Sequence, residues 1–433
     1  MNHSKDTIVI VGAGLTGLSA AYRLLKRGHA VTIIEKNETV GGLASSFKIR
    51  EWNWSLEKYY HHWFTNDYSA LKLAQEIDHQ VIIKKPNTNL YYMDRTYPFD
   101  SPVAILSFPY FSIVDKVRLS LSLVYLKITN KYQMFEKLTA LSWAYKYMGQ
   151  TVTRIVWGPL FSGKFAQHKD KISLTWFWAR IKKRTPKLGY PYGGFASFTQ
   201  SLVRQIQKMD GIIVLSDGVK KVRRTKNGFA IQTDKRTKLH ADKILVTTPS
   251  FLLSKLFPML PSAYKKKLEA TRYLSAQVLV LRLRKKFMDK TYWLNMSDPA
   301  SPFLAVVEHT NYMDPRHYNG EHIVYVGNYL SPNHPYLLMS AQELLKVFDQ
   351  QLSKINKNYK RDLIDLHLFS LPGAQPIVDR GYADRIPKMR TPIKNIYIAN
   401  MEMVYPWDRG TNYAIEYGEK VAEIIARDFS EKQ

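Results

Sequence analysis

The sequence predicts an α/β fold whose parallel sheet is assembled from separated parts of the chain. Three observations predict it. A strand, a glycine turn, a helix and a second strand follow one another over residues 7–35. A hairpin signal and an apolar strand lie mid-chain, at 217–248, and a further apolar strand with an amphipathic helix behind it occupies 395–427. Strands that alternate with helices in this way are typical of a mostly parallel sheet covered by helices.

The N-terminal segment has the order of elements of a βαβ unit. Thr7–Val11 is a continuous, β-branched apolar run, as expected of a buried parallel strand. Leu18–Arg27 predicts a helix that Gly28 terminates. Ala30–Ile34 predicts a second strand, which ends at Glu35. The turn between the first strand and the helix reads Gly-Ala-Gly-Leu-Thr-Gly, so three glycines lie where the chain changes direction.

Each glycine of this turn has a separate task in holding a dinucleotide. Gly12 permits the tight turn, Gly14 lets the backbone approach a pyrophosphate, and Gly17 lets the helix pack closely on the strand. The free N–H groups at the helix start would bind the phosphates. Glu35 would accept hydrogen bonds from a ribose. Because the strand, the helix and the acid ~20 residues on accompany the glycines, the segment predicts a Rossmann-type nucleotide site.

A second glycine pair, Gly41 and Gly42, follows Glu35 within a few residues. With it, the chain resembles the FAD-dependent superfamily of amine oxidases, phytoene desaturases and protoporphyrinogen oxidases, to which UDP-galactopyranose mutases are related. In that family a Gly-Gly loop follows the first βαβ unit, and the match favours FAD over NAD. The resemblance covers both ends and the middle block, about half of the chain, and it implies an FAD-dependent enzyme.

The C-terminal and middle blocks fit the same resemblance. Asn395–Ala399 predicts a buried strand and Thr411–Arg427 a helix. In family members a helix at this place points its N-terminus at the flavin, where amide donors stabilise the anionic reduced ring. The family usually has Gly-Asp after the strand, where this chain has Asn400. Asn227-Gly228 predicts a hairpin, and the resemblance places Val219, at its start, against the adenine.

The resemblance implies an FAD-binding domain of the Rossmann type, interleaved along the chain with an α+β substrate domain. We expect residues 1–89, 205–265 and 376–433 to form the FAD-binding domain, and residues 90–204 and 266–375 to form the substrate domain. The implied cofactor contacts come from all three blocks of the first domain: Gly12, Gly14, Leu15, Thr16, Gly17, Glu35, Lys36, Gly41, Gly42, Leu43, Ala44, Val219, Asn400, Gly410, Thr411, Asn412 and Ala414.

Two adjacent histidines, His61 and His62, are the candidate catalytic residues. They lie in an aromatic segment that resembles the one which family members run past the flavin ring. Histidine titrates near working pH, so these side chains could move protons. The alternative is structural, with the rings packed at a domain interface. Adjacent residues cannot form the i, i+4 pair of a helical zinc site, so no metal is predicted here.

Further residues are candidates for lining a substrate cavity. The turn-rich, aromatic segment 157–165 could line the cavity or could be a packed loop between helices. Glu308, at the end of an apolar strand, could face the cavity or could simply end the strand. The residues just before the C-terminal helix favour a cavity role because family members often place an aromatic there. The candidates are Tyr59, Tyr60, Trp157, Lys164, Glu308, Tyr405 and Trp407.

Charge and composition restrict the partners. The 433 residues include 63 basic and 36 acidic side chains, a net charge of +27, and no cysteine. Disulfides, thiolate metal sites and cysteine nucleophiles are therefore excluded, and anionic partners such as nucleotides, phosphorylated lipids or an anionic membrane are favoured. The basic residues form scattered runs, such as Lys182–Arg184, without a nucleic-acid motif. We therefore expect a solvated basic surface and no nucleic-acid binding.

The apolar, aromatic stretch Ala104–Leu126 raises the question of membrane contact. No apolar run reaches the ~18 residues that span a bilayer, and the N-terminal run is too short for a signal peptide, so we expect a cytoplasmic protein. Docking of this stretch on the inner face of an anionic membrane is one interpretation. We favour an ordinary buried helix, because no lysine-rich polar face flanks a clean apolar stripe.

We expect an FAD-dependent oxidoreductase that transfers a hydride from an organic, large apolar or phosphorylated substrate to flavin N5. The alternative is a mutase-like flavoprotein that acts on a nucleotide sugar or sugar-lipid without net redox change, which the basic balance also suits. The sequence contains no second glycine-rich βαβ unit for a nicotinamide cofactor. This favours reoxidation by oxygen, a quinone or another protein, or no net oxidation.

Overall fold

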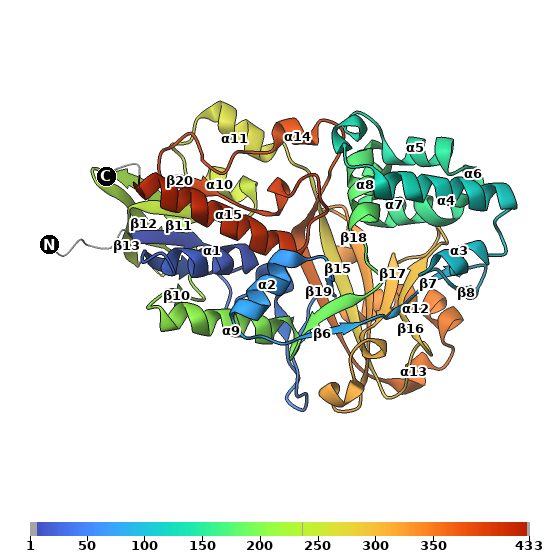
Figure 1. Cartoon of the computed structure of the whole chain (residues 1–433). Helices are drawn as coiled ribbons and strands as arrows, with labels where there is room; N and C mark the ends of the chain where they lie inside the picture. Colours follow the sequence, from blue (N-terminus) through green and yellow to red (C-terminus); the bar gives the residue numbers. More distant parts are fainter. Residues whose placement is uncertain (1–6, 236, 431–433) are drawn as a thin grey trace.

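A computed structural model describes residues 7–235 and 237–430 (Figure 1). A parallel sheet with its helices forms the end of the molecule at which both chain termini lie, and a large mixed sheet with a cluster of helices beside it forms the opposite end. The expected α/β class is confirmed. None of the helices in the described ranges is long and apolar enough to cross a membrane.

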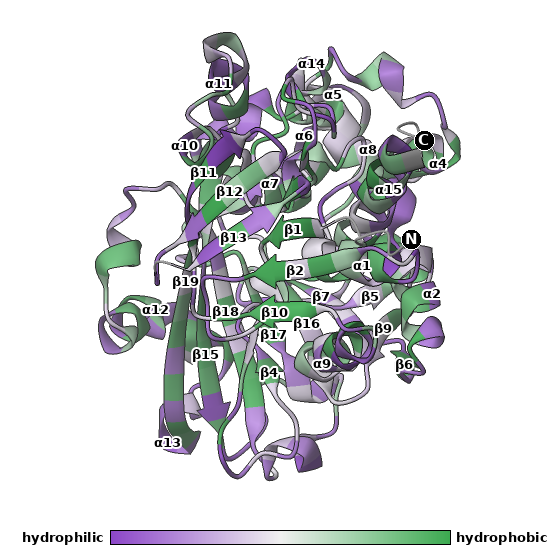
Figure 2. Ribbon diagram, turned by 90° about the vertical axis from the view of Figure 1, so that its left-hand side faces the viewer, coloured by the Kyte–Doolittle hydropathy of each residue, from purple (hydrophilic) through white to green (hydrophobic). Residues whose placement is uncertain are grey.

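The parallel sheet has the strand order β10-β2-β1-β14-β20, and every neighbouring pair runs parallel. Figure 2 shows β1, β2 and β10 as largely hydrophobic, as expected of strands that helices and loops cover on both faces. The first two strands have the predicted bounds. The five strands are β1 (Thr7–Val11), β2 (Ala30–Ile34), β10 (Ile212–Val214), β14 (Lys243–Val246) and β20 (Ile396–Ile398).

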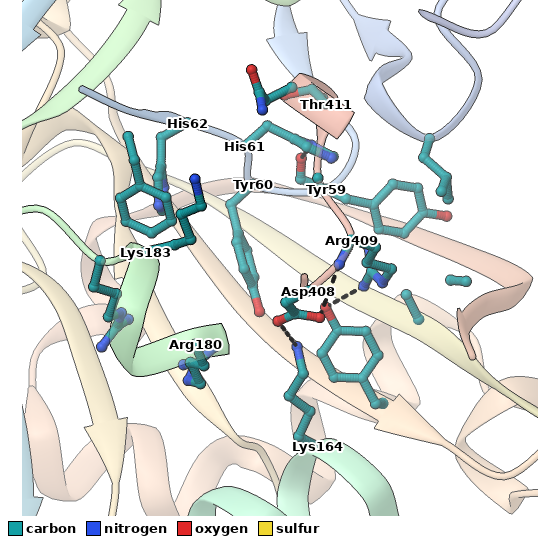
Figure 3. Close-up of a pocket in the computed structure, with 18 of the residues that line it drawn as sticks. Tyr59, Tyr60, His61, His62, Lys164, Arg180, Lys183, Asp408, Arg409 and Thr411 are labelled. Carbon is teal, nitrogen blue, oxygen red and sulfur yellow. Dashed lines mark hydrogen bonds and ion pairs between the residues drawn. The ribbon is translucent and has the colours of Figure 1, made fainter. Parts of the chain in front are cut away.

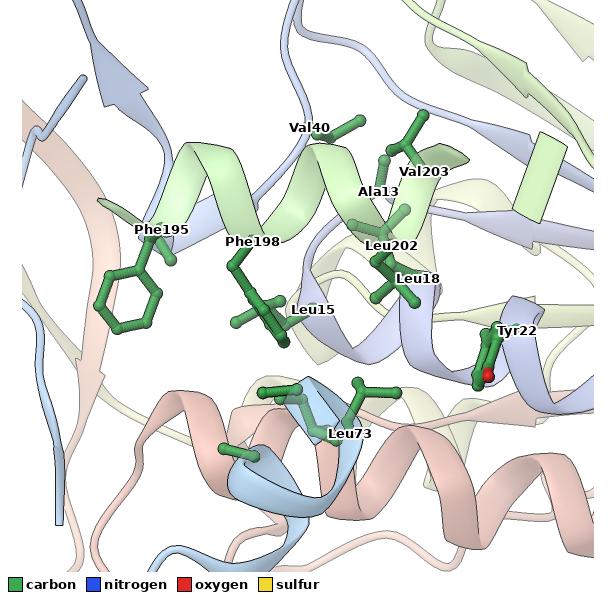
Figure 4. Packing of buried hydrophobic residues seen from close by; sticks show 14 of the residues in the cluster. Ala13, Leu15, Leu18, Tyr22, Val40, Leu73, Phe195, Phe198, Leu202 and Val203 are labelled. Atoms are coloured by element: carbon green, nitrogen blue, oxygen red, sulfur yellow. The ribbon is translucent and has the colours of Figure 1, made fainter. Parts of the chain in front are cut away.

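Four helices cover this sheet: α1 (Leu15–Leu25), α2 (Tyr68–Glu76), α9 (Gly194–Lys208) and α15 (Thr411–Ser430). Helix α1 begins three residues before the predicted start, directly at the glycine turn, because Gly14 is its N-cap. Leu15 and Leu18 of α1 pack against Phe198 and Leu202 of α9, with Leu73 of α2 beside them (Figure 4). Helix α9 crosses the predicted domain boundary at 204–205, and the division into two domains stays a prediction.

A three-stranded antiparallel sheet follows the middle block, with β11 (Val219–Thr225), β12 (Gly228–Thr233) and β13 (Lys238–Ala241). The first two strands form the hairpin that Asn227-Gly228 predicts, and Gly228 has φ +129°. Two further small sheets are present. One pairs β3 (Ser46–Phe47) with β4 (Leu56–Glu57), and the other has the order β5 (Trp63–Phe64), β9 (Leu188–Pro191), β6 (Val81–Lys84).

The second sheet has seven strands in the order β19-β15-β18-β17-β16-β7-β8. Its first strand along the chain, β7, begins inside the first predicted FAD-domain segment. Helix α12 (Ala341–Ile355) begins with a capping box between Ser340 and Glu343. The strands are β7 (Asn87–Tyr92), β8 (Arg95–Pro98), β15 (Tyr273–Leu283), β16 (Thr291–Met296), β17 (Ala305–Glu308), β18 (His322–Leu330) and β19 (Leu363–Pro376).

A cluster of helices flanks this sheet: α3 (Pro102–Leu106), α4 (Ile113–Ile128), α5 (Ala140–Tyr147), α6 (Gln150–Val152), α7 (Gly158–Phe165) and α8 (Leu174–Lys183). Short helices connect the remaining strands: α10 (Ser250–Leu256), α11 (Ser262–Glu269), α13 (Tyr359–Asp362) and α14 (Tyr382–Arg385).

The prediction of a turn-rich loop over residues 157–165 is wrong, because Gly158–Phe165 is the helix α7. Pro159 lies in its first turn, where a missing N–H costs no helical hydrogen bond. Phe161 and Phe165, four residues apart, are both fully buried. A Cβ on Gly163 would lie 2.6 Å from the side chain of Leu304, so the glycine lets α7 approach the mixed sheet.

Candidate active site

The glycine turn after β1 lies against the Gly-Gly loop. The backbone N–H of Gly41 donates to the carbonyl of Ala13 at 2.9 Å. A Cβ on Gly42 would come within 3.2 Å of Gly14 Cα, so a side chain there would push the two segments apart. The two glycine segments that the sequence singled out therefore form one continuous backbone surface at the start of α1.

The space beside Gly14 fits a pyrophosphate. Gly14 has an ordinary φ of −71°, and the nearest atom to a Cβ at this position, Gly42 Cα, would be 3.9 Å away. Neither the backbone conformation nor the packing of the protein therefore requires a glycine here. No side chain caps α1 and no acid lies in its first turn, so its N–H groups and positive dipole end remain for a phosphate. Gly17 differs, since its Cβ would lie 2.0 Å from the Gly12 carbonyl oxygen.

Glu35 lies at the edge of the same turn. Its carboxylate is buried and accepts hydrogen bonds from the backbone N–H of Ala13, at 2.8 Å, and from Asn37. These three hydrogen bonds use three of the about four acceptor positions of an ionised carboxylate, so one position remains for a ribose hydroxyl. The Asp217 N–H donates to the Glu35 carbonyl, and a Cβ on Gly218 would lie 3.7 Å from Lys36 Cβ. Glu35, Lys36 and the start of β11, where Val219 lies, thus come together.

Thr248 is a candidate that the sequence reasoning missed. Its Oγ1 is buried without a hydrogen-bond partner, and its methyl group would lie 3.4 Å from a Cβ on Gly12. A buried, unpaired hydroxyl is costly unless a ligand satisfies it, so Thr248 fits the edge of a nucleotide site. The one sequence feature that could have identified Thr248 is its position just after the apolar strand β14. Asn400 is already engaged: its amide donates to the Thr248 carbonyl and the Ser250 hydroxyl, at 3.0 Å each.

A pocket lies where α15 begins, between the parallel-sheet half and the mixed sheet (Figure 3). Its walls come from residues 59–64, from α7 and α8, from β15, β16 and β18, and from the segment 408–413. The pocket thus joins parts of the chain more than 300 residues apart. It brings together nine of the predicted site residues: Leu43, Tyr59, Tyr60, His61, His62, Lys164, Gly410, Thr411 and Asn412.

The two histidines line this pocket as neutral rings. Burial lowers the pKa of His61 to about 4 and that of His62 to about 3. His61 Nδ1 contacts the Tyr59 carbonyl oxygen, which can only accept, so Nδ1 carries the proton and Nε2 remains an acceptor. His62 Nδ1 lies 3.3 Å from the Tyr292 hydroxyl. At neutral pH both rings are therefore uncharged, and each has one ring nitrogen that can accept a hydrogen bond.

Side chains from distant segments fix the start of α15 at the pocket wall. The indole N–H of Trp63 donates to Thr411 Oγ1 at 2.8 Å, which ties the histidine segment to this helix. Asn412 Oδ1 accepts from the Ala70 N–H at 3.0 Å. The Ala414 N–H donates to the Gly410 carbonyl and closes the first turn. The positive end of the helix dipole thus lies at the pocket, where it stabilises negative charge.

A network of charged side chains forms the floor of the pocket (Figure 3). Lys164 pairs with Asp408 at 3.5 Å, and the Arg409 guanidinium donates to the Tyr329 hydroxyl at 2.8 Å and to Gln375 at 3.0 Å. Burial alone would raise the pKa of Tyr329, but Arg409 and Lys164 bring it below its usual value. Asp408 and Arg409, which follow one another just before α15, both belong to this network.

Three more cations from α8 and its end line the pocket without a direct ion pair. Of the ion pairs between described residues, none includes Arg180, Lys183 or Arg184. Two of them contact aromatic faces instead: Lys183 Nζ lies 4.4 Å from the centroid of Trp407, and the Arg180 guanidinium lies 5.7 Å from that of Trp176. Burial lowers the pKa of Arg180. Of the run Lys182–Arg184, Arg184 is exposed as expected, whereas Lys183 is only half-exposed and lines the pocket.

Four candidates do not reach the pocket lining. Trp157 packs on Phe177 within the helix cluster. Glu308 is fully buried and accepts the backbone N–H groups of Phe287 and Met288, so it holds that turn, and burial raises its pKa to about 8. The Tyr405 hydroxyl donates to Glu136. Trp407 stacks on Trp178 with the ring centroids 5.1 Å apart and supports the pocket through Lys183.

Three features define a dinucleotide-binding enzyme of the α/β class: the glycine turn at Gly14, Glu35 at the end of β2, and the start of α15 at the pocket. The family model of flavin containing amine oxidoreductases matches residues 15–426. The chain belongs to this family, and its cofactor is FAD. The resemblance that the glycine motifs indicated is confirmed.

Solved structures show the same fold. A reduced UDP-galactopyranose mutase is similar over 98% of this chain and 94% of its own, with a TM-score of 0.78 and 16% identity. Cyclohexylamine oxidase from Brevibacterium oxydans IH-35A is similar over 99% of this chain and 100% of its own, with a TM-score of 0.74 and 14% identity. At such identities the likeness extends to the fold alone.

Sequence relatives share shorter parts. A 4,4'-diapophytoene desaturase of Staphylococcus haemolyticus is 66% identical over 41 residues, which are 10% of this chain and 8% of that protein. An L-amino-acid oxidase of Siganus canaliculatus is 22% identical over 330 residues, which are 66% of this chain and 59% of that protein. The chain thus spans less than two thirds of the length of these curated relatives.

Proposed function

We propose that the protein is an oxidoreductase that removes a hydride from an organic substrate with an anionic group, such as a phosphorylated or lipid-like small molecule. The observation that carries this proposal is the set of pocket cations that form no direct ion pair, Arg180, Lys183 and Arg184. Guanidinium groups bind phosphate or carboxylate through two parallel hydrogen bonds. An anion in the pocket would give these three cations a direct partner of opposite charge.

FAD, when bound, accepts the hydride at its ring nitrogen N5. The protein binds and orients it: the space beside Gly14 and the start of α1 would hold the pyrophosphate, and Glu35 the ribose. Val219 would cover the adenine. The start of α15 would stabilise the negative charge of the reduced ring. The unprotonated Nε2 of His61, a ring that lines the pocket, would accept the proton that the substrate releases.

We predict that His61→Gln and His62→Gln, made separately, both keep the flavin. His61→Gln removes the proposed proton acceptor and should lose about a hundredfold or more in turnover. Flavin absorbance per protein and kcat measure the two effects. Because the pKa of His61 is about 4, the wild-type kcat/KM should show no histidine limb between pH 5 and 8 and should fall as His61 gains a proton at lower pH. If both variants turned over at the wild-type rate, the two histidine rings would have a structural role only.

A mutase-like function is the second candidate, in which a nucleotide sugar or sugar-lipid rearranges without net oxidation. The same three cations favour it, because a nucleotide sugar carries a diphosphate. The two functions differ in the flavin state that they require. A mutase turns over only after the flavin has been reduced and leaves the substrate at its original oxidation level. An oxidoreductase bleaches its own flavin anaerobically when it meets the substrate.

The anion site can be tested before the substrate is known. We predict that inorganic pyrophosphate, titrated at constant ionic strength, perturbs the flavin spectrum of the holoenzyme. Arg184→Met should raise its apparent Kd about tenfold to a hundredfold, the range for a hydrogen bond to a charged group. Lys266→Met removes the same charge from an exposed position on α11 and serves as control. Equal pyrophosphate affinities of the two variants would contradict the site.

A further inference from the structure

Large apolar side chains gather on the surface at the end of the molecule opposite the chain termini (Figure 1). Among the described residues 23 such side chains are exposed, and 14 of them lie between residues 103 and 147. The exposed fractions reach 81% at Ile113, 72% at Val103 and 67% at Ile128. Scattered exposed apolar residues are normal, but a contiguous patch marks an interaction surface.

Helix α4 carries the centre of this patch as one continuous stripe. We call it the α4 apolar stripe, and it consists of Ile113, Val114, Val117, Leu121, Val124 and Ile128. At 3.6 residues per turn these six positions fall within about 100° of the helix circumference. The buried positions of α4, such as Leu119 and Leu126, lie on the other side. The expectation of an ordinary buried helix is therefore wrong for this segment.

Basic side chains border the stripe on both sides. In the helical projection Lys116 and Lys127 lie along one edge and Arg118 along the other. Residues 101–150 contain six basic and two acidic side chains. An apolar helix face edged by lysine and arginine is the pattern of a helix that lies in the plane of a membrane interface. Lys116 can extend to the headgroups while the apolar face enters the acyl region. Lys127 and Arg118 donate to backbone carbonyls of the protein and hold their positive charges beside the stripe.

We propose that the α4 apolar stripe docks on a bilayer that contains anionic lipids. The charge pattern favours a membrane over a second copy of this chain, because two copies joined through the stripe would bring like-charged edges together, whereas anionic headgroups compensate them. The apolar side chains would enter about 5–10 Å into the boundary between headgroups and acyl chains. The docking itself does not depend on the identity of the substrate.

The docking helix is joined directly to the pocket. The ammonium group of Lys127, at the end of α4, donates to the carbonyl oxygens of Ile181, Lys182 and Arg184, at 3.3, 3.0 and 2.9 Å. These carbonyls close α8, the helix that places Arg180 and Lys183 in the pocket wall. A docked bilayer would therefore lie one helix away from the pocket cations. If the proposed function holds, a phosphorylated lipid is the class of substrate that this arrangement suits.

The test is co-sedimentation of the holoenzyme with phosphatidylcholine vesicles, with and without phosphatidylglycerol, at low and high salt. The wild-type protein should bind the anionic vesicles and lose part of this binding at high salt. The double variant Leu121→Asp/Ile128→Asp should bind at least about tenfold more weakly, since it places two charges in the apolar stripe. Leu338→Asp, at a side chain 90% exposed and outside the stripe, is the matched control and should bind like the wild type.

Flavin absorbance and the thermal unfolding temperature show whether each variant is folded, without any assay of turnover. Equal vesicle binding by the double variant and the Leu338 variant would overturn the proposal, as would a wild-type protein that stays in the supernatant at low salt. A wild-type dimer that dissociates in the double variant would identify a second copy as the occupant and would also overturn it. Failure of the pyrophosphate titration leaves the membrane result unaffected.

Discussion

Gly14→Val should yield a folded protein that has lost its flavin. The φ of Gly14, −71°, suits any residue, and a Cβ there would meet no protein atom nearer than 3.9 Å. The added side chain would instead fill the space at the start of α1 in which the pyrophosphate fits. Loss of close contact between the phosphates and the helix N–H groups should weaken FAD binding well over tenfold, since tenfold corresponds to only about 1.4 kcal/mol.

The measurement is the flavin absorbance per protein after incubation with excess FAD, beside the far-UV circular dichroism spectrum. Gly320→Ala is a suitable control for lost stability. Gly320 has φ +76° and open space around its Cβ position, so alanine strains the backbone there without a clash. That variant should lose some stability and keep its flavin. A yellow Gly14→Val protein would mean that the cofactor does not pass this turn.

Gly418→Val should destabilise the protein more than any other substitution considered for this chain. Gly418 lies in α15 where it crosses α1, and a Cβ there would fall 2.0 Å from Ser19 Oγ and 2.4 Å from the Thr16 carbonyl oxygen. A backbone carbonyl cannot rotate away as a side chain can, so the two helices must separate. We expect a loss of about 3 kcal/mol or more, together with weaker FAD binding, because both helix starts serve the cofactor.

Thermal unfolding followed by tryptophan fluorescence measures this effect. Gly410→Ala, whose Cβ would approach only Tyr413, at 3.9 Å, is the control and should keep the wild-type unfolding temperature. Ser19→Gly should rescue part of a Gly418→Ala variant by removing the Oγ, and the Thr16 carbonyl should limit the rescue. An unchanged unfolding temperature in Gly418→Val would show that the contact between α1 and α15 is looser than these distances require.

The parts of the fold that depend on neighbouring residues could be predicted. Thr7–Val11 and Ala30–Ile34 have the bounds expected from their apolar runs, and the Asn227-Gly228 hairpin forms as expected. In each case the signal is local, since hydrophobic period and turn chemistry act within a few residues. The glycine spacing likewise carried the nucleotide site and the family, because the tasks of these glycines follow from backbone geometry.

The environment of a side chain could not be predicted in the same way. From the sequence we expected Lys183 on a solvated surface, yet it lines the pocket and packs on Trp407. Glu308 read as a cavity residue, yet it holds the N–H groups of a turn twenty residues away. The α4 apolar stripe read as buried, yet it faces outward. The pattern of apolar or charged residues shows which face of a helix differs from the rest. It does not show whether that face contacts protein, ligand or solvent.

By itself the sequence indicated the α/β class, the strand-turn-helix start, the FAD cofactor and the family, because the motifs that indicated them are residue types at short, fixed spacings. Only the tertiary structure decided which cations share the pocket with His61 and His62 and which face of α4 remains exposed. Such choices depend on contacts between segments hundreds of residues apart, and the free energy of burying or pairing a side chain exists only once those contacts have formed.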